Sequence, residues 1–252
     1  MENYHDPPAS SLDGGHPHVV CSSCSLRELC LPAGIDPREM ERIDSLVNHR
    51  RKFRRGEHLY RAGAPLASLY AIRSGTMKSC VLYEDGREQV AGFHMMGDLL
   101  GMDAISAGRH MCDIVALEDC EVCEIPFSRL EQLSRELPPL QHQLHRIMSR
   151  EIVRDYGVML LLGSMKAEER LAAFLLNLSQ RFATRGYSAT DFNLRMTREE
   201  IGSYLGLKLE TISRVLSRFH QDGLIEVHHK HLRITDAGRL RRVLGQTPTA
   251  DA

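Results

Sequence analysis

The pattern of hydrophobic and polar residues divides the chain into parts with different periodicities. Between residues 52 and 126, short runs of alternating apolar and polar residues are separated by glycines. A period of two is typical of strands with one buried face, and frequent turns are typical of a small antiparallel barrel or jelly roll. Within this part, Asp85 and Gly86 predict a two-residue hairpin turn, in which both central residues need a positive φ.

A long helix is predicted after the β-rich part, over residues 139–163. Apolar residues recur there every three or four positions, at Leu140, Leu144, Met148, Ile152, Met159 and Leu162. This stripe can pack against the same helix of a second subunit. Asp155 falls on the stripe, where in a symmetric pair it comes close to its own copy and opposes association. Alternatively, Asp155 turns to the edge, where it reaches water or pairs with Arg150 or Arg154.

A helix-turn-helix is predicted in the segment "MTREEIGSYLGLKLETISRVLSRFHQDG". Thr197 and Glu200 have the spacing of a capping box, so a short helix begins there, and Gly206 then turns the chain. A second helix over residues 208–221 has one apolar face, made by Ile212, Val215, Leu216 and Phe219. The following "LIEVHHKHLRIT" predicts two short strands around a His-Lys turn, which completes a winged helix-turn-helix.

The polar residues of this second helix have the chemistry of DNA recognition. Arg214 can form two hydrogen bonds to a guanine, and Glu210 can accept one from an exocyclic amine such as that of cytosine. Ser213 can contact a base or a phosphate. Phosphate contacts, which set affinity through charge, are assigned to Lys208, Arg218 and Arg195. The alternative is a helical hairpin with a solvated face, but cap, glycine turn, wing and basic charge coincide here.

Charge is unevenly distributed along the chain. Residues 165–245 hold 14 Lys and Arg against 9 Asp and Glu, whereas residues 1–164 hold 18 against 23. This asymmetry indicates that only the C-terminal part meets a polyanion. No run of about 18 apolar residues and no signal-peptide pattern is present, so we expect a cytoplasmic protein.

Three of the seven cysteines fall in "CSSCSLRELC", residues 21–30, at a spacing that core packing does not require. An odd number of cysteines without an export signal argues against a disulfide framework and favours reduced thiols, some of them on a metal. Downstream, Asp36 is predicted to cap a helix that starts at Pro37. Its buried residues would be Met40, Ile43 and Leu46 or Val47.

A β-roll, a long helix and a winged helix-turn-helix, in this order, resemble the superfamily of the cyclic-AMP receptor protein. The similarity is to its fumarate-and-nitrate-reduction regulator (FNR) branch, and it spans about residues 20–245. The stretches that carry it are "LYAIRSGTMKS", "EQVAGFHMMGDLLGMDAI", "VCEIPF", "AEERLAAFLLNLSQRF" and "IGSYLGLKLETISRVLSRF".

The resemblance implies a transcription factor, not an enzyme, that controls the switch to anaerobic metabolism in response to oxygen. Its dimer would bind palindromic DNA with TTGAT-type half-sites through Glu210, Ser213 and Arg214. The implied fold is α+β with a cyclic-nucleotide-binding-like jelly roll. The expected parts are a disordered tail (1–20), a cysteine-rich cluster-binding segment (21–36), a β-roll sensor domain (37–138), a dimerisation helix (139–163), a winged helix-turn-helix domain (164–245) and a second tail (246–252).

The resemblance also implies a [4Fe-4S] cluster held by Cys21, Cys24, Cys30 and Cys123. Spacing alone does not choose the fourth ligand, because three further cysteines are available: Cys80, Cys112 and Cys120. Each of these is equally explained as a small buried residue in a strand. A zinc ion could use the same four thiolates but would have no redox response to oxygen, so a zinc- or haem-sensing regulator of this superfamily is an alternative.

The family further implies how the parts work together. With the cluster bound, the cysteine segment docks and the long helices pair despite Asp155, and cluster loss in oxygen removes the dimer and with it specific DNA binding. An activator also contacts RNA polymerase. The resemblance assigns this contact to the loop formed by Glu84, Asp85, Gly86 and Arg87, which is otherwise a charged turn.

Two other functions have weaker support. Cyclic-nucleotide receptors place an Arg-Ser pair at the cyclic phosphate, whereas the alignment puts His110 and Met111 there. Asp98 stands where an acidic residue contacts ribose, but without the arginine the phosphate is poorly compensated. An enzyme would need His94, Asp98, Asp103 and His110 to form an acid/base or metal site, yet no catalytic motif accompanies them.

Overall fold

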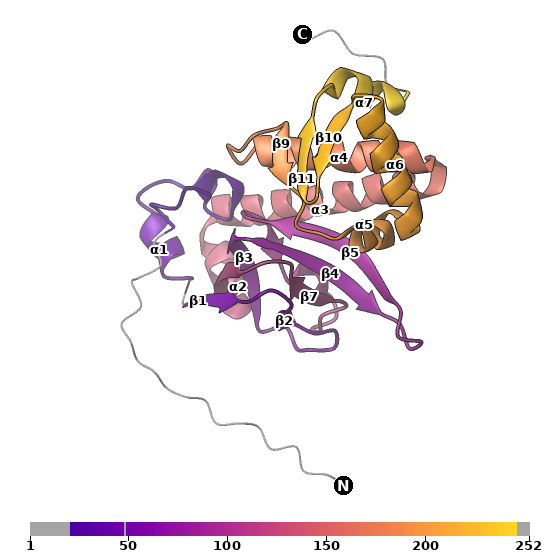
Figure 1. Cartoon of the computed structure of the whole chain (residues 1–252). Coiled ribbons are helices and arrows are strands. Elements are labelled where there is room, and N and C mark those ends of the chain that lie inside the picture. The colour runs from indigo at the N-terminus through magenta and orange to yellow at the C-terminus, as the bar shows by residue number, and fades with distance from the viewer. Residues whose placement is uncertain (1–20, 48, 246–252) are drawn as a thin grey trace.

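The computed structural model describes residues 21–47 and 49–245, so both predicted tails lie outside the described residues. The chain forms a β-roll, a long helix, and a C-terminal domain of helices with a small sheet (Figure 1). The predicted α+β class, with its jelly roll, long helix and helix-turn-helix, is confirmed. Of the described helices, none is both long and apolar enough to cross a membrane.

The β-roll consists of two antiparallel four-stranded sheets. The first has the order β1 (His49–Phe53), β8 (Cys120–Pro126), β3 (Ser68–Ser74) and β6 (Leu99–Leu100). The second has the order β2 (His58–Tyr60), β7 (Asp113–Ala116), β4 (Thr76–Leu82) and β5 (Glu88–Met95). Alternating apolar residues of both sheets enclose one core, which includes Ile72, Met77, Ile114 and Val122. A 3-10 turn, η2 (Met102–Ala104), follows β6.

The hairpin between β4 and β5 differs from the predicted two-residue turn. Its loop spans residues 83–87, and the amides of Gly86 and Tyr83 donate to the carbonyls of Tyr83 and Arg87, both at 2.9 Å. Gly86 has φ of 83°, whereas His229 is the only described non-glycine residue with a positive φ. The prediction was therefore wrong about Asp85, because a tight turn that ends in a left-handed glycine needs only that one positive φ.

The helix predicted after the cysteines also starts later than expected. After η1 (Arg27–Leu29), α1 covers only Met40–Asp44. Asp36 accepts a hydrogen bond from the Arg38 amide at 2.8 Å, so it closes a separate turn before the helix. The predicted burial is confirmed: the buried residues include Met40, Ile43, Leu46 and Val47.

Two helices follow the β-roll. α2 (Phe127–Glu136) leads into α3 (Pro138–Ser164), which extends the prediction by one residue at each end. The N-terminal half of α3 packs against the cysteine segment and the β-roll through Leu140 and Ile147. α3 crosses most of the molecule, with the cysteine segment near one end and the C-terminal domain along the rest (Figure 1).

The C-terminal domain has the predicted helix-turn-helix and wing. Its elements are α4 (Ala167–Ala183), β9 (Asp191–Asn193), α5 (Arg198–Leu205), α6 (Leu209–Gln221), β10 (Ile225–His228), β11 (His231–Ile234) and α7 (Ala237–Val243). The capping box is present, since the Glu200 amide donates to Thr197 Oγ1 at 3.1 Å and the Thr197 amide to Glu200 Oε2 at 2.7 Å. Gly206 has φ of 63° and separates α5 from α6.

Candidate metal centre and nucleic-acid interface

Four cysteines from two distant segments line one cavity. Cys21, Cys24 and Cys30 come from the N-terminal segment, and Cys123 comes from β8. The segment is shaped by consecutive turns, in which the Cys24 amide donates to the Cys21 carbonyl and the Cys30 amide to the Leu26 carbonyl, both at 3.1 Å. These turns place three thiols around the space that Cys123 borders from the β-roll.

Three contacts hold the cysteine segment in place. Asp44 of α1 accepts a hydrogen bond from the Cys21 amide at 2.5 Å. Gln143 of α3, which is buried, donates from Nε2 to the Cys30 carbonyl at 3.0 Å. On the third side Leu29 lies over Gly97, where an added Cβ would come within 2.9 Å of the Leu29 Cβ. The segment is thus tied to α1, to α3 and to the turn between β5 and β6.

Burial and nearby charges favour the protonated, neutral form of the thiols in this cavity when no metal is bound to them. Burial, followed by the nearby Cys30 and Asp44, raises the pKa of Cys21 to about 12, and burial likewise raises the pKa of Cys30 to about 12. Burial also raises the pKa of Cys123, although the charges of Arg50 and Arg73 oppose it.

Cationic donors lie around the same thiols. Arg73 Nη1 is 3.8 Å from the Cys24 sulfur, in hydrogen-bonding geometry. The buried Nε atoms of Arg27 and Arg50 have no hydrogen-bond partner within the described ranges. Arg27 lines the cavity, and Arg50 is paired across the strands with Cys123. A buried donor without a partner is uncommon, and here both occur where negative sulfur ligands would sit.

The other three cysteines do not line this cavity. Cys120 is buried, and its sulfur donates to the carbonyls of Thr76 and Glu118 at 3.4 and 3.2 Å. Cys80 lies in β4 of the other sheet, and the sulfur of Cys112 donates to Asp103 at 3.7 Å.

Among the described residues, no three Cys, His, Asp or Glu side chains lie close enough together to hold a single metal ion.

Helix α6, which is predicted to be the DNA-recognition helix, presents its predicted polar residues to solvent. Glu210 and Arg214 are exposed on α6, Ser213 is partly exposed, and Lys208 is exposed just before the helix begins. Ser213 Oγ accepts a hydrogen bond from Arg198 Nη1 at 3.3 Å. Sequence reasoning missed Arg198, although a basic residue in the first turn of α5 was a signal for it.

Two residues assigned to phosphates have acidic partners instead. Arg195 pairs with Glu118 of the β-roll at 3.2 Å. Arg218 pairs with Glu168 of α4 at 2.5 Å and lies 3.9 Å from Asp222. Each must exchange a carboxylate for a phosphate to contact DNA. Their partners come from other elements, so no local pattern revealed them.

The predicted stripe on α3 divides into two parts. Leu140 is buried and Leu144 packs on the apolar cluster that α3 shares with the cysteine segment, whereas Ile152 and Met159 are 52% and 59% exposed. The exposed apolar face is wider than predicted, because it also includes Val153, Tyr156 and Leu160. Val153, Tyr156 and Leu160 follow one another at intervals of three and four residues, and this helical spacing in the sequence could have revealed the wider face. Met148 is half-buried, and Leu162 lies at the exposed end.

Asp155 is exposed on this same face of α3. Arg154 forms its ion pair with Glu151, one turn earlier, and not with Asp155. Of the two forms of the alternative, the one with an arginine partner is not seen, since Asp155 forms no ion pair with Arg150 or Arg154, whereas its carboxylate is open to water. A carboxylate therefore lies among exposed apolar side chains.

The residues considered for an enzyme do not converge. His94 contacts Ser79 at 3.0 Å, and Asp98 pairs with arginines at and just after the end of α4. Only Asp103 and His110 meet, at 3.3 Å. His110 is buried and stacked on the Tyr60 ring, so the polar groups in this part of the β-roll satisfy one another.

Comparison with known proteins identifies the family. The Crp-like helix-turn-helix domain matches residues 169–243, and the cyclic nucleotide-binding domain matches residues 50–136. The fumarate and nitrate reduction regulatory protein of Escherichia coli (strain K12) is 46% identical over 94% of this chain and 94% of its own length. The chain belongs to the FNR branch of the cyclic-AMP receptor protein superfamily. It is therefore a transcription regulator with a DNA-binding helix-turn-helix, and not an enzyme.

Other FNR-branch and superfamily proteins agree. The transcriptional regulatory protein btr of Bordetella pertussis is 46% identical over 94% of this chain and 96% of its own length. The solved structure of FixK2 from Bradyrhizobium japonicum matches with a TM-score of 0.73 and 31% identity, and covers 82% of this chain and all of that chain. A match of that extent must include both the β-roll and the C-terminal domain.

Proposed function

We propose that this FNR-branch regulator senses oxygen in the cytoplasm through a [4Fe-4S] cluster held by Cys21, Cys24, Cys30 and Cys123. The observation that carries the proposal is that these four thiols line one cavity although they come from two distant segments. Relatives named for fumarate and nitrate reduction support it. When bound, the cluster would supply reactivity toward oxygen and hold the cysteine segment on the β-roll.

The donor set fits such a group. Four thiols that surround a cavity suit a centre with several iron atoms, each of which takes one thiolate. Arg50 and Arg73 beside Cys123 offset the negative charge of the thiolates. The Nε atoms of Arg27 and Arg50 make no hydrogen bond in the described structure, although Arg27 Nε lies 3.7 Å from Glu28, and both can donate to sulfur. A zinc ion is the alternative, and metal analysis separates the two.

The cysteine segment is positioned to act on the long helix. Leu31 and Ile35 of the segment share one apolar core with Leu140 and Ile147 of α3. Gln143 between them hydrogen-bonds the Cys30 carbonyl. When the segment leaves, α3 loses apolar cover and a buried hydrogen bond on the same side of the helix. The orientation of α3 would change as a result.

The exposed half of α3 is proposed to form the dimer. Exposed apolar side chains at Ile152, Tyr156 and Met159 can pack on a second copy, whereas Asp155 opposes this. The docked segment would favour the dimer enough to overcome that repulsion. Two recognition helices held in register would then bind palindromic TTGAT-type half-sites, with Glu210, Ser213 and Arg214 on base edges.

RNA polymerase is proposed to contact the β4–β5 loop. Arg87 pairs with Asp85 at 2.6 Å and lies over the Tyr83 ring. Leu82 and Tyr83 are 65% and 50% exposed, so the hairpin offers apolar as well as charged surface. Apolar and aromatic residues at the centre of a charged rim are typical of protein interfaces. Glu84 and Gly86 complete the loop.

Iron and acid-labile sulfide analysis tests the sensor. Protein purified without oxygen is expected to hold about four of each per chain, with visible absorption that bleaches in air. Zinc, haem or no metal in protein purified this way would reject the oxygen sensor and leave the DNA-binding function intact.

Replacement of Asp155 tests the dimer. Asp155→Ala is expected to sediment as a dimer in air, because the repulsion at the α3 face is removed. Glu131→Ala, which removes an exposed carboxylate from α2, is the matched control and should behave like the parent. Aerobic sedimentation that shows only monomer for Asp155→Ala would reject this role for Asp155.

A further inference from the structure

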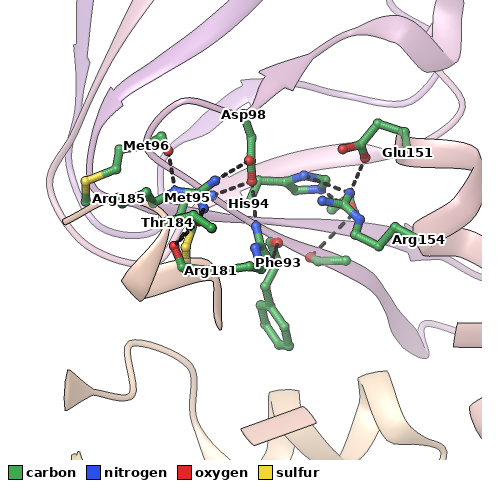
Figure 2. Close-up of polar contacts among 12 residues, drawn as sticks. Phe93, His94, Met95, Met96, Asp98, Glu151, Arg154, Arg181, Thr184 and Arg185 are labelled. Atoms are coloured by element: carbon green, nitrogen blue, oxygen red, sulfur yellow. Dashed lines mark hydrogen bonds and ion pairs between the residues drawn. The ribbon is translucent and has the colours of Figure 1, made fainter. Parts of the chain in front are cut away.

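The turn between β5 and β6 lies between the cysteine segment and the DNA-binding domain. On one side Gly97, with φ of 88°, is in close contact with Leu29. On the other side Asp98, the next residue, meets helix α4. Figure 2 shows the Asp98 carboxylate beside the guanidinium groups of Arg181 and Arg185. One two-residue turn thus contacts both functional regions.

The Asp98 carboxylate forms short ion pairs with two arginines. Its carboxylate oxygens lie 2.5 Å from Arg181 Nη2 and 2.6 Å from Arg185 Nη2. Arg181 also donates to the Phe93 carbonyl at 2.9 Å, and Arg185 to the Met96 carbonyl at 2.6 Å. Arg181 in the last turn of α4 and Arg185 just after the helix therefore bind both the carboxylate and the backbone carbonyls around it (Figure 2).

The turn itself is held rigidly on the β-roll. The Gly97 amide donates to the Ile72 carbonyl at 2.8 Å, and the Ile72 amide donates to the Asp98 carbonyl at 3.0 Å. The Met95 amide donates to the Asp98 side chain at 2.9 Å. Asp98 is thus fixed by the β-roll before α4 approaches, so it can determine where α4 lies.

Charge makes this contact sensitive to the loss of Asp98. The side chains of Arg181 and Arg185 are only 15% and 7% exposed. Burial by itself would raise the pKa of Asp98, but the two arginines outweigh burial and hold that pKa below its ordinary value. Without the carboxylate, two buried cations would face each other, and an uncompensated buried charge is strongly destabilising.

The position of helix α4 determines the position of the recognition helix, α6. Phe174 and Leu175 of α4 share one apolar core with Ile212 and Leu216 of α6. These helices form a packed unit, so a change in how α4 sits on the β-roll moves α6 with it.

The geometry points to Asp98 as a positioning residue for DNA binding: it holds α4 through Arg181 and Arg185 and so orients the recognition helix. Because Gly97 packs on Leu29, this turn is also a second route from the cysteine segment to the DNA-binding domain, separate from dimerisation. Only this second statement rests on the proposed oxygen sensor. The role of Asp98 in DNA binding does not.

Two substitutions test the role of Asp98. Asp98→Asn removes the charge but keeps an oxygen for the Met95 amide. Arg185→Gln breaks the same ion pair from the segment just after α4, together with the hydrogen bond to the Met96 carbonyl. Both are expected to weaken anaerobic binding to a TTGAT-type palindromic duplex by at least about tenfold, because fewer molecules hold the competent orientation. Dimerisation, measured by sedimentation, should stay within about twofold of the parent.

Glu136→Gln is the matched control. It removes one charge from an exposed arginine–carboxylate pair, that of Arg42 with Glu136, which lies outside the contact with the DNA-binding domain, and should change binding less than about twofold. The double variant Asp98→Asn, Arg185→Gln should lose less binding than the two single losses combined, since both single variants remove the Asp98–Arg185 ion pair.

Hydrogen exchange provides a readout that does not depend on the cluster or on the DNA sequence. In both variants, amides of residues 93–98 and 181–185 should exchange at least about tenfold faster than in the parent, while those of α6 keep their protection. Unchanged exchange, or a loss of DNA binding explained by an equal loss of dimer, would overturn the proposal. If the parent lacks a cluster but the exchange changes as expected, the oxygen sensor fails while the role of Asp98 stands.

Discussion

The recognition helix and the cysteine cavity differ in how much of the chain is needed to build them. α5 and α6 are adjacent in sequence, the capping box starts the first, and Gly206 sets the turn between them. The cavity instead takes three thiols from a segment with little regular structure and the fourth from β8. A site that depends on a few long-range contacts can open while a locally built one stays folded. This difference suits the cysteine cavity to the proposed sensing and the recognition helix to DNA binding.

The largest effect is expected at Cys123, the one of the four thiols that the β-roll supplies. Cys123→Ala should lower iron and sulfide to near zero. It should also weaken anaerobic DNA binding by more than about 100-fold, because a monomer brings one recognition helix to the DNA whereas the dimer brings two linked ones. Cys120→Ala is the matched control, since Cys120 lies in the same strand but outside the cavity. Equal loss of iron in both variants would mean that β8 supplies no specific ligand.

The next effect concerns only the DNA-binding region. Arg214→Ala should cost about 1–3 kcal/mol of DNA binding and relax discrimination at one base pair, because the exposed guanidinium loses its base contact. Arg218→Ala should instead weaken all sequences alike and reduce the salt dependence, as expected for a phosphate contact. Anisotropy titrations with single-base variants of the duplex measure both. A uniform loss in Arg214→Ala would remove its assignment to a base.

A smaller effect is expected at Gln143, which connects the cysteine segment to α3. Gln143→Ala leaves the Cys30 carbonyl without its partner, at a cost of about 1–3 kcal/mol. We expect the visible absorption to bleach roughly five times faster in air, because the segment leaves more often. Gln141→Ala, at an exposed position of the same helix, should bleach like the parent. Identical rates in all three proteins would exclude this route to α3.

The smallest effect is expected at His94, which lies between the two regions. Burial first, and then the charge of Arg154, lower its pKa to about 3, so the folded chain keeps this ring neutral. Below an unfolded pKa of about 6.5 only the unfolded chain takes up the proton, and stability falls as the pH drops, by at most about 1.4 kcal/mol per pH unit.

His94→Gln should therefore flatten the loss of stability between pH 6.5 and 5, while the stability near pH 8 changes less. Urea unfolding of parent and variant across this range measures the difference in slope. A variant with the parental slope would show that His94 takes up its proton in the folded state as well. The contacts of His94 with Ser79 Oγ and Arg154 Nη2, at 3.0 and 3.4 Å, are those of a neutral ring.

The parts that depend on neighbouring residues could be predicted from the amino-acid sequence. Alternation predicted the strands of the β-roll, and the spacing of Thr197, Glu200 and Gly206 predicted α5 and α6 almost to the residue. Cysteine spacing, together with the family resemblance, selected the four thiols that the structure places around one cavity. These features follow from local periodicity, capping and side-chain chemistry, which the chain carries wherever it folds.

Features that depend on partners from elsewhere in the chain became visible in the folded molecule alone. Folding placed Asp98 between Arg181 of α4 and Arg185 just after it, gave Arg195 and Arg218 acidic partners, and left the C-terminal half of α3 uncovered. It also moved the start of α1 to Met40 and shaped the hairpin loop around one left-handed glycine. Burial and ion pairing are properties of residues brought together by folding, so spacing along the sequence does not contain them.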